Sequence, residues 1–165
     1  MSTTQAGLSA LWPLIRGLRN PILTTRRTNG GLQSRPVAMQ NRETDRLDFL
    51  WFFIPADSPQ VDDLQWDSAV SIVFADAHKA ACVAVFGSAA VVDDTARKRV
   101  FWSAEAASRF TGPDDPELAL VRVRIIQADH WEVERNAATP IFKLDNSVLT
   151  PKPASDRSSS GAMHH

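Results

Sequence analysis

The sequence predicts a mainly β (α+β) domain, a mostly antiparallel barrel with small flanking helices. Six or seven short runs have strand patterning and are separated by turn residues, which is typical of barrels. Two or three short helical patterns lie between them. The run at residues 49–54 is apolar on both faces, as expected of a strand covered twice. A chain of 165 residues is long enough for one domain with a sizeable core.

Composition excludes several classes of partner. The chain carries 18 Lys and Arg against 19 Asp and Glu, so no net field attracts nucleic acid or an anionic membrane. Cys82 stands alone and cannot form an internal disulfide, and no Cys/His cluster has zinc-ligand spacing, so we expect no metal site. No apolar run reaches the roughly 18 residues of a membrane span. We therefore expect a soluble, cytoplasmic protein.

The N-terminal region predicts a helix and then a hairpin. Residues 1–8 are expected to be loose, and apolar residues then recur at helical spacing until Asn20-Pro21. A β-rich run at 22–25 leads to the turn Asn29-Gly30-Gly31 and a returning strand at 32–39. Pro36 cannot donate to a ladder, so it belongs at an edge or bulge where backbone groups are free.

The stretch 47–67 joins an apolar strand directly to a helix start. Phe49, Trp51 and Phe53 point to one face of the strand; Leu50, Phe52 and Ile54 point to the other. We expect the barrel interior to cover one face, and a partner subunit or a flat ligand to cover the other.

The helix predicted at Pro59–Trp66 has two candidate caps. Ser58 before Pro59 reads as an N-cap, and Asp57 with Gln60 is a competing capping box. In either case the first turn is expected to present free backbone N–H groups beside an aromatic strand, which suits a phosphate attached to a planar ring. An ordinary capped helix that binds nothing is the commoner alternative.

The rest of the chain adds strands and two short helices. Strands are expected at 69–75 and at 80–92, the second bending at Gly87. Helices are expected at 95–102, capped by Asp93 or Asp94, and at 104–110; strands are expected at 118–128 and 130–135. Residues 140–149 carry enough apolar side chains to pack on the domain, which is set at 1–149, and residues 150–165 read as a disordered tail.

The order of several short motifs resembles one known family. The matching pieces are Leu23-Thr24-Thr25, Ser34-Arg35-Pro36-Val37-Ala38, Leu50-Trp51-Phe52-Phe53, Asp57-Ser58-Pro59-Gln60-Val61, Val85-Phe86-Gly87-Ser88-Ala89, Phe101-Trp102-Ser103, Gly112 with Asp115-Pro116, and His130-Trp131. Together they resemble the general stress protein 26 branch of the pyridoxamine 5'-phosphate oxidase-like flavoproteins. The resemblance covers most of residues 11–132 and implies an antiparallel split β-barrel.

The resemblance also implies a cofactor and a partner. In that family each FMN lies at a homodimer interface. Carried over, Thr25 belongs to the cofactor site, the run Arg35, Pro36, Val37 and Ala38 lies beside the flavin and its phosphate tail, and Trp51, Phe52, Phe53 and Ile54 flank the ring. Ser58 and Gln60 face the phosphate, and Trp102 forms an aromatic wall from the same subunit or the other one.

The function implied is that of an FMN-dependent oxidoreductase, a reductase or oxidase whose substrate is not indicated. Gln60 stands where the family usually has lysine, which removes one charge partner of the phosphate and predicts roughly tenfold weaker binding of FMN. No catalytic acid or base can be assigned. The alternatives are a non-catalytic flavin carrier or redox sensor, or a barrel that holds haem, a deazaflavin or no cofactor.

Overall fold

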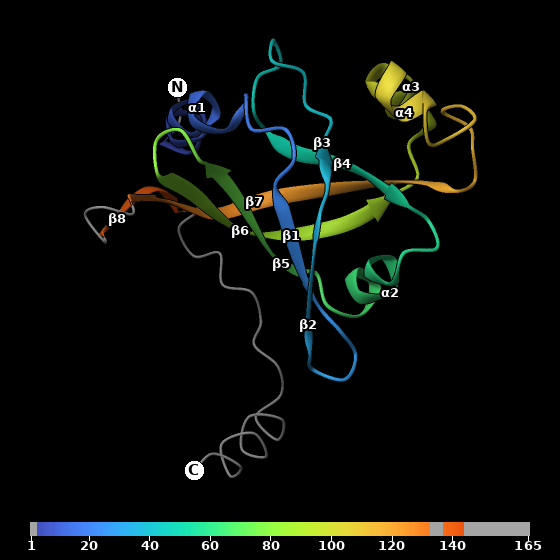
Figure 1. The fold of residues 1–165 in the computed structure, drawn as a ribbon, viewed down its shortest axis with the longest axis horizontal. Helices are drawn as coiled ribbons and strands as arrows, with labels where there is room; N and C mark the ends of the chain where they lie inside the picture. Colours follow the sequence, from blue (N-terminus) through green and yellow to red (C-terminus); the bar gives the residue numbers. More distant parts are fainter. Residues whose placement is uncertain (1–2, 133–136, 144–165) are drawn as a thin grey trace.

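The computed structural model describes residues 3–132 and 137–143, which form an antiparallel sheet with helices at its margins (Figure 1). The elements are α1 (Thr3–Ile15), β1 (Ile22–Arg26), β2 (Leu32–Pro36), β3 (Ala38–Met39), β4 (Phe49–Pro55), α2 (Pro59–Trp66), β5 (Ala69–Asp76), β6 (Ala81–Val92), α3 (Thr95–Phe101), α4 (Ala104–Ala107), β7 (Leu118–Glu132) and β8 (Ala137–Lys143). The expected barrel with small flanking helices is confirmed. The boundary at 149 and the tail at 150–165 lie outside the described residues.

The sheet closes through one short segment of chain. Its strand order is β2-β1-β5-β6-β7-β4-β3, with β8 paired to β7, so the two ends of the order are β2 and β3. These strands are consecutive in sequence and separated by Val37 alone. The strand predicted at 32–39 therefore pairs with β1 over its first half and with β4 over its second. It changes partner next to Pro36, where the missing N–H was expected to interrupt a ladder.

The β1–β2 hairpin has the turn that its sequence predicts. Gly30 adopts φ of 87°, a left-handed conformation that glycine reaches without a steric penalty. The backbone N–H of Gly31 donates to the Asn29 side-chain oxygen at 2.9 Å, and Arg27 N–H donates to Gly31 O at 2.8 Å. The hairpin thereby places Arg35 opposite Leu23 on β1.

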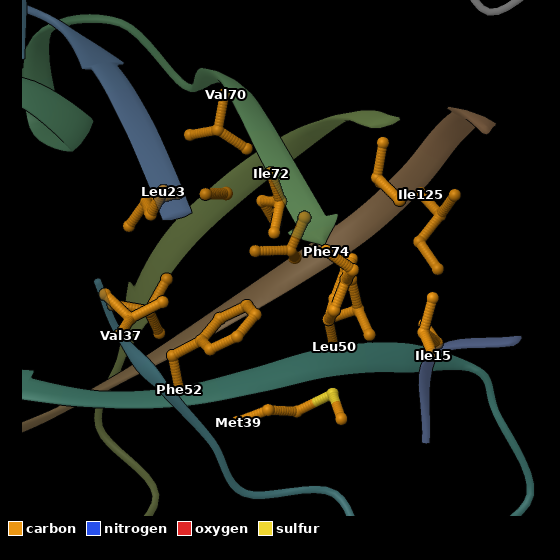
Figure 2. Close-up of a cluster of buried hydrophobic side chains, with 14 of the residues drawn as sticks. Ile15, Leu23, Val37, Met39, Leu50, Phe52, Val70, Ile72, Phe74 and Ile125 are labelled. Atoms are coloured by element: carbon orange, nitrogen blue, oxygen red, sulfur yellow. The ribbon is translucent and has the colours of Figure 1, made fainter. Parts of the chain in front are cut away.

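The main core fills the inside of the barrel. Phe52 of β4 and Ile72 and Phe74 of β5 are fully buried and face one another, with Val37 and Met39 closing the space beside Phe52 (Figure 2). Burying one such side chain contributes about 1.5–3 kcal/mol. Val37 is thus fixed in the core, and it anchors the segment that changes partner between β1 and β4.

The second face of β4 is covered by the same chain. Trp51 and Phe53 are buried and pack in a second cluster with residues of α3, α4 and β7, namely Phe101, Ala106, Leu118 and Leu120. The guanidinium of Arg97 lies 4.4 Å from the centre of the Trp51 ring. We expected a partner subunit or a flat ligand over this face; within the chain, α3 and α4 cover Trp51, while Phe53 also lines a narrow space beside β3.

Several boundaries differ from those expected. The first helix begins at Thr3 and not after residue 8, because Leu8 extends its buried stripe by one turn. The helices α3 and α4 end earlier, at Phe101 and Ala107. The two strands expected at 118–128 and 130–135 form one continuous strand, β7, which ends at Glu132 within the described residues. Its long pairing with β6 keeps it extended.

Gly87 marks the bend predicted in β6. The β6–β7 register shifts between Phe86 and Gly87, and a Cβ at Gly87 would lie 2.6 Å from the Arg124 carbonyl oxygen. We expect Gly87→Ala to lower the free energy of unfolding by about 1–3 kcal/mol, because the backbone of β7 must move. Urea denaturation measures this. Gly112→Ala is the control, since a Cβ there meets no atom within 4 Å; equal stability of the two variants would contradict the close approach.

Candidate functional site

The start of α2 settles which cap the helix uses. Ser58 is the N-cap, with Pro59 at the first helical position, and its side-chain oxygen accepts from the Gln60 backbone N–H at 3.3 Å. Asp57 is exposed and does not cap the helix. The first of the two predicted caps is therefore the correct one.

The free backbone N–H groups expected at this helix start are engaged or missing. Pro59 has no N–H, the Gln60 N–H donates to Ser58 Oγ, and the Val61 N–H donates to Ser58 O at 3.0 Å. An anion here would be held mainly by side chains.

Arg35 and Ser58 form the polar centre of the site. Arg35 Nη1 donates to Ser58 Oγ at 2.8 Å. A serine oxygen accepts two hydrogen bonds and donates one. The two acceptor positions of Ser58 are taken by Arg35 and by the Gln60 N–H, so its O–H proton is left for a third group. The pair offers an anion a guanidinium and a hydroxyl donor side by side.

Gln60 points away from this pair and into a buried polar cluster. Its side chain is fully buried, and Nε2 approaches Leu23 O, Thr25 Oγ1 and Gln33 O at 3.3–3.4 Å. Thr25 donates to Asp63 Oδ2 at 2.8 Å. Gln60 Oε1 has no partner among the described atoms. This cluster joins β1 and β2 to α2, and so fixes the two elements that carry Arg35 and Ser58.

A cavity of about 520 Å³ opens beside the Arg35–Ser58 pair. Its lining comes from the segment joining β2 to β3, from the start of α2 and from two loops: Asn20, Gln33, Ser34, Arg35, Pro36, Val37, Ala38, Ser58, Pro59 and Arg109. Of the sequence-predicted residues, the run 35–38 and Ser58 are brought together here. Its volume lies within the range of about 300–1,000 Å³ usual for small-molecule sites.

The cavity continues along β3. A narrower space adds Phe53, Ile54 and Phe110 and shares residues 35–38 and Arg109 with the first cavity. A third cavity, of about 280 Å³, shares Ala38 with both and is lined by Trp102. We call these three spaces, which share lining residues, the β3 groove. Residues between 33 and 40 line all three spaces, and so do residues between 100 and 110, at and just after the ends of α3 and α4.

Four predicted site residues do not line the β3 groove. Thr25 and Gln60 belong to the buried polar cluster, and Phe52 to the main core. Trp51 packs against Phe101 with ring centres 5.8 Å apart. The hydrogen bonds and packing contacts of these four residues account for their burial without a cofactor.

Arg109 lines the groove although it was not assigned a binding role from the sequence; with Phe110 it stands where the resembled family often has tryptophan. It is exposed and lines the first two cavities of the β3 groove, facing the strand that carries Arg35. Neither arginine forms an ion pair within the described ranges, whereas Arg26, Arg42, Arg97 and Arg99 do. No local sequence pattern indicated that Arg35 and Arg109 line the same cavity, since they are far apart along the chain.

The groove combines hydrogen-bond donors that can bind an anion with apolar residues that can pack against a ring. Arg35, Arg109 and the Ser58 hydroxyl suit a phosphate, and the lining by Pro36, Val37 and Phe53 suits a ring. The residues present therefore fit FMN. The described residues contain no group of three or more His, Cys, Asp or Glu that could hold a metal ion. In the same part of the chain, no helix is long and apolar enough to span a bilayer.

Sequence comparison identifies relatives over nearly the whole chain. Residues 7–154 match the family model described as pyridoxamine 5'-phosphate oxidase like. The chain is also 27% identical over 143 residues to "Protein bli-3" of Neurospora crassa, an alignment covering 81% of this chain and 68% of that protein. The family resemblance indicated by the motifs is confirmed.

Solved structures share the fold. A protein related to general stress protein 26, of the pyridoxinephosphate oxidase family, from Clostridium acetobutylicum superposes with a TM-score of 0.72 at 18% identity, covering 86% of this chain and 96% of that one. The general stress FMN/FAD binding protein of Xanthomonas citri gives a TM-score of 0.65 at 22% identity, covering 87% and 97%. At these identities the likeness establishes the split-barrel fold.

The buried cluster around Gln60 makes a testable contribution to stability. Gln60→Met keeps a similar shape but removes the donor shared by Leu23 O and Gln33 O, so we expect a loss of about 1 kcal/mol or more in unfolding free energy. Gln65→Met on the exposed side of α2 is the matched control. Chemical denaturation compares the two, and an unchanged midpoint for Gln60→Met would contradict the role of the amide.

Proposed function

The chain belongs to the pyridoxamine 5'-phosphate oxidase-like family, and from that premise we propose that it is a homodimeric FMN-binding protein of the general stress type that acts as a flavin-dependent oxidoreductase. The observation that carries the proposal is the Arg35–Ser58 pair at the wide end of the β3 groove. When bound, FMN supplies the electron and hydride chemistry, and the protein supplies position and hydrogen bonds.

The phosphate is assigned to the wide end of the groove. Arg35 is held in place by its bond to Ser58, so the guanidinium is already oriented before a ligand arrives. Arg109 approaches the same cavity from the other wall. Two arginines with no ion pair among the described residues, and a hydroxyl donor, replace the charge partner that the family usually supplies at position 60. Gln60 contributes indirectly, because its buried amide holds α2 against the strands β1 and β2.

The flavin ring is assigned to the middle of the groove. Pro36, Val37 and Ala38 form one side, while Phe53, Ile54 and Phe110 extend the apolar lining. An apolar site with a few fixed polar groups is the usual environment of a cofactor ring. The backbone N–H groups of Val37 and Met39 already donate to Pro21 O and Arg19 O, so this segment would meet the ring mainly with its side chains.

The outer face of the sheet supports a homodimer. Across three adjacent strands, the rows Ile22, Val73 and Ala84 and Thr24, Ser71 and Phe86 contain no charged side chain. Phe86 and Ile22 are about two-fifths exposed, at 39% and 40%. Ser34, bonded to Thr24, lines the wide cavity as well, so this face adjoins the groove. An uncharged, partly apolar sheet face of this kind suits a second copy of the chain.

If Arg35 binds the phosphate, a substitution of Arg35 should change the affinity for FMN but not the affinity for riboflavin. We expect Arg35→Gln to weaken FMN roughly tenfold to a hundredfold and to leave riboflavin unchanged, because only FMN offers an anion to the lost cation. Flavin fluorescence quenching measures both affinities. Arg27→Gln, at the exposed hairpin turn, is the control. Saturation at one FMN per chain is expected, and equal losses for both flavins would contradict the phosphate assignment.

If the uncharged sheet face around Phe86 forms the dimer interface, a charge introduced there should dissociate the dimer. Phe86→Glu should shift the protein to monomers in sedimentation equilibrium at micromolar concentration, because a desolvated carboxylate opposes association. Leu14→Glu, an exposed apolar position on α1, should leave the dimer intact. A wild-type monomer with flavin bound would overturn the homodimer.

A flavin carrier or redox sensor is the second candidate function. It is favoured by the lining of the groove, in which Glu105 is the one carboxylate and no histidine occurs among the described lining residues. Anaerobic addition of NADH or NADPH separates the two. Rapid bleaching of the visible absorbance of bound flavin, about 10 s⁻¹ or faster as in typical enzymes, supports a reductase. Persistent colour with normal binding supports the carrier.

A further inference from the structure

The far end of the β3 groove is a separate cavity with its own chemistry. It encloses about 280 Å³ between β3 and the junction of α3 with α4. Its lining residues are Arg19, Ala38, Met39, Gln40, Arg42, Val100, Phe101, Trp102, Ser103 and Glu105. It lies beyond the space assigned to the flavin ring and shares Ala38, Gln40 and Glu105 with it. Neither Arg35 nor Ser58 reaches it.

Arg19 supplies an uncompensated positive charge there. Its guanidinium is held by two backbone carbonyls, with Nη2 donating to Met39 O at 2.7 Å and Nη1 to Arg16 O at 3.3 Å. Carbonyl oxygens fix its orientation but carry no net charge, and in the part of the chain that the structure describes Arg19 has no ion pair. A guanidinium has five N–H donors, so donors remain for a ligand.

The other charged groups do not cancel this cation. Arg42 is paired with Asp45 at 2.8 Å, so its charge is largely neutralised locally. Burial by itself raises the pKa of Asp45, but the hydrogen bonds from Arg42, together with its charge, outweigh burial and lower that pKa overall. Glu105 is exposed and lies where this cavity meets the flavin space, so water screens its charge. Arg19 is the half-buried charge that a ligand would meet.

An aromatic wall completes the cavity. Trp102 ends α3 in a half-buried position and packs on the second hydrophobic cluster beside Phe101. Ser103 Oγ accepts from Ala106 N–H at 3.2 Å, which leaves its hydroxyl proton as a donor at the same edge. A planar ring can stack on the indole while an attached anion meets Arg19.

We propose that this cavity binds a planar organic acid, a conjugated or aromatic carboxylate, as a substrate-class ligand next to the flavin. The assignment to a substrate rests on the proposed function, whereas the binding itself rests on Arg19, Trp102 and the size of the cavity. A carboxylate is favoured over a phosphate because the cavity offers one unpaired guanidinium, while the wide end of the groove offers two.

The test uses the full chain, with and without FMN, and three probes: benzoate, its neutral analogue benzamide, and the non-planar cyclohexanecarboxylate. Calorimetry should give one benzoate site per chain, roughly tenfold tighter than benzamide because the bond is charge-assisted. Arg19→Gln should abolish that preference while still offering an N–H to Met39 O. Trp102→Leu should abolish the preference for benzoate over cyclohexanecarboxylate. Arg27→Gln should change neither preference.

The outcomes separate this inference from the proposed function. Benzamide binding as tightly as benzoate, or a benzoate preference that survives Arg19→Gln, would overturn the inference. Benzoate that competes with FMN would also overturn it, because the acid would then occupy the flavin space. Arg19-dependent benzoate binding by a protein that binds no FMN would uphold the cavity and overturn the flavoprotein function.

Discussion

The structure depends on one segment that belongs to both ends of the sheet. Residues 32–36 complete the ladder of β1, Val37 enters the core, and residues 38–39 begin a ladder with β4. Val37 N–H donates to Pro21 O and Met39 N–H to Arg19 O, so the segment stays bonded as it changes partner. The segment thereby links the two ends of the strand order, β2 and β3. It also leaves a place where backbone and side chains face a groove and not another strand.

The groove follows from that closure and from two helical additions. The start of α2 brings Ser58 to Arg35, and the buried cluster of Gln60, Thr25 and Asp63 holds the helix to the strands. On the other side α3 and α4 cover the second face of β4, and their far ends become the opposite wall. The same packing thus stabilises β4 and shapes the groove, so its two walls are rigid elements and not loops alone.

Charge is distributed unevenly along this groove. The chain is nearly neutral, yet Arg19, Arg35 and Arg109 line the groove without an ion pair in the described residues, whereas Arg26, Arg42, Arg97 and Arg99 have one. Net charge therefore says little about the ligand. Arg35 and Arg109 lie at the wide end, and Arg19 lies at the narrow end beside the paired Arg42 and the exposed Glu105. Apolar residues lie between the two ends. A ligand with an anionic tail and a planar ring, followed by a smaller acid, matches this order.

The sequence by itself determined most of the elements, because their signals are local: alternation in the strands, Ser58-Pro59 at a helix start, Asn29-Gly30 in a turn and Gly87 at a bend. It also determined the family, through motifs in a fixed order. It did not predict β8 as a strand or β7 as one continuous strand. Only the tertiary structure decided that α3 and α4 cover Trp51, that Gln60 turns inward, and that Arg109 faces Arg35's cavity. These are contacts between residues distant in the chain, and no local periodicity encodes which side chain fills a space that another element creates.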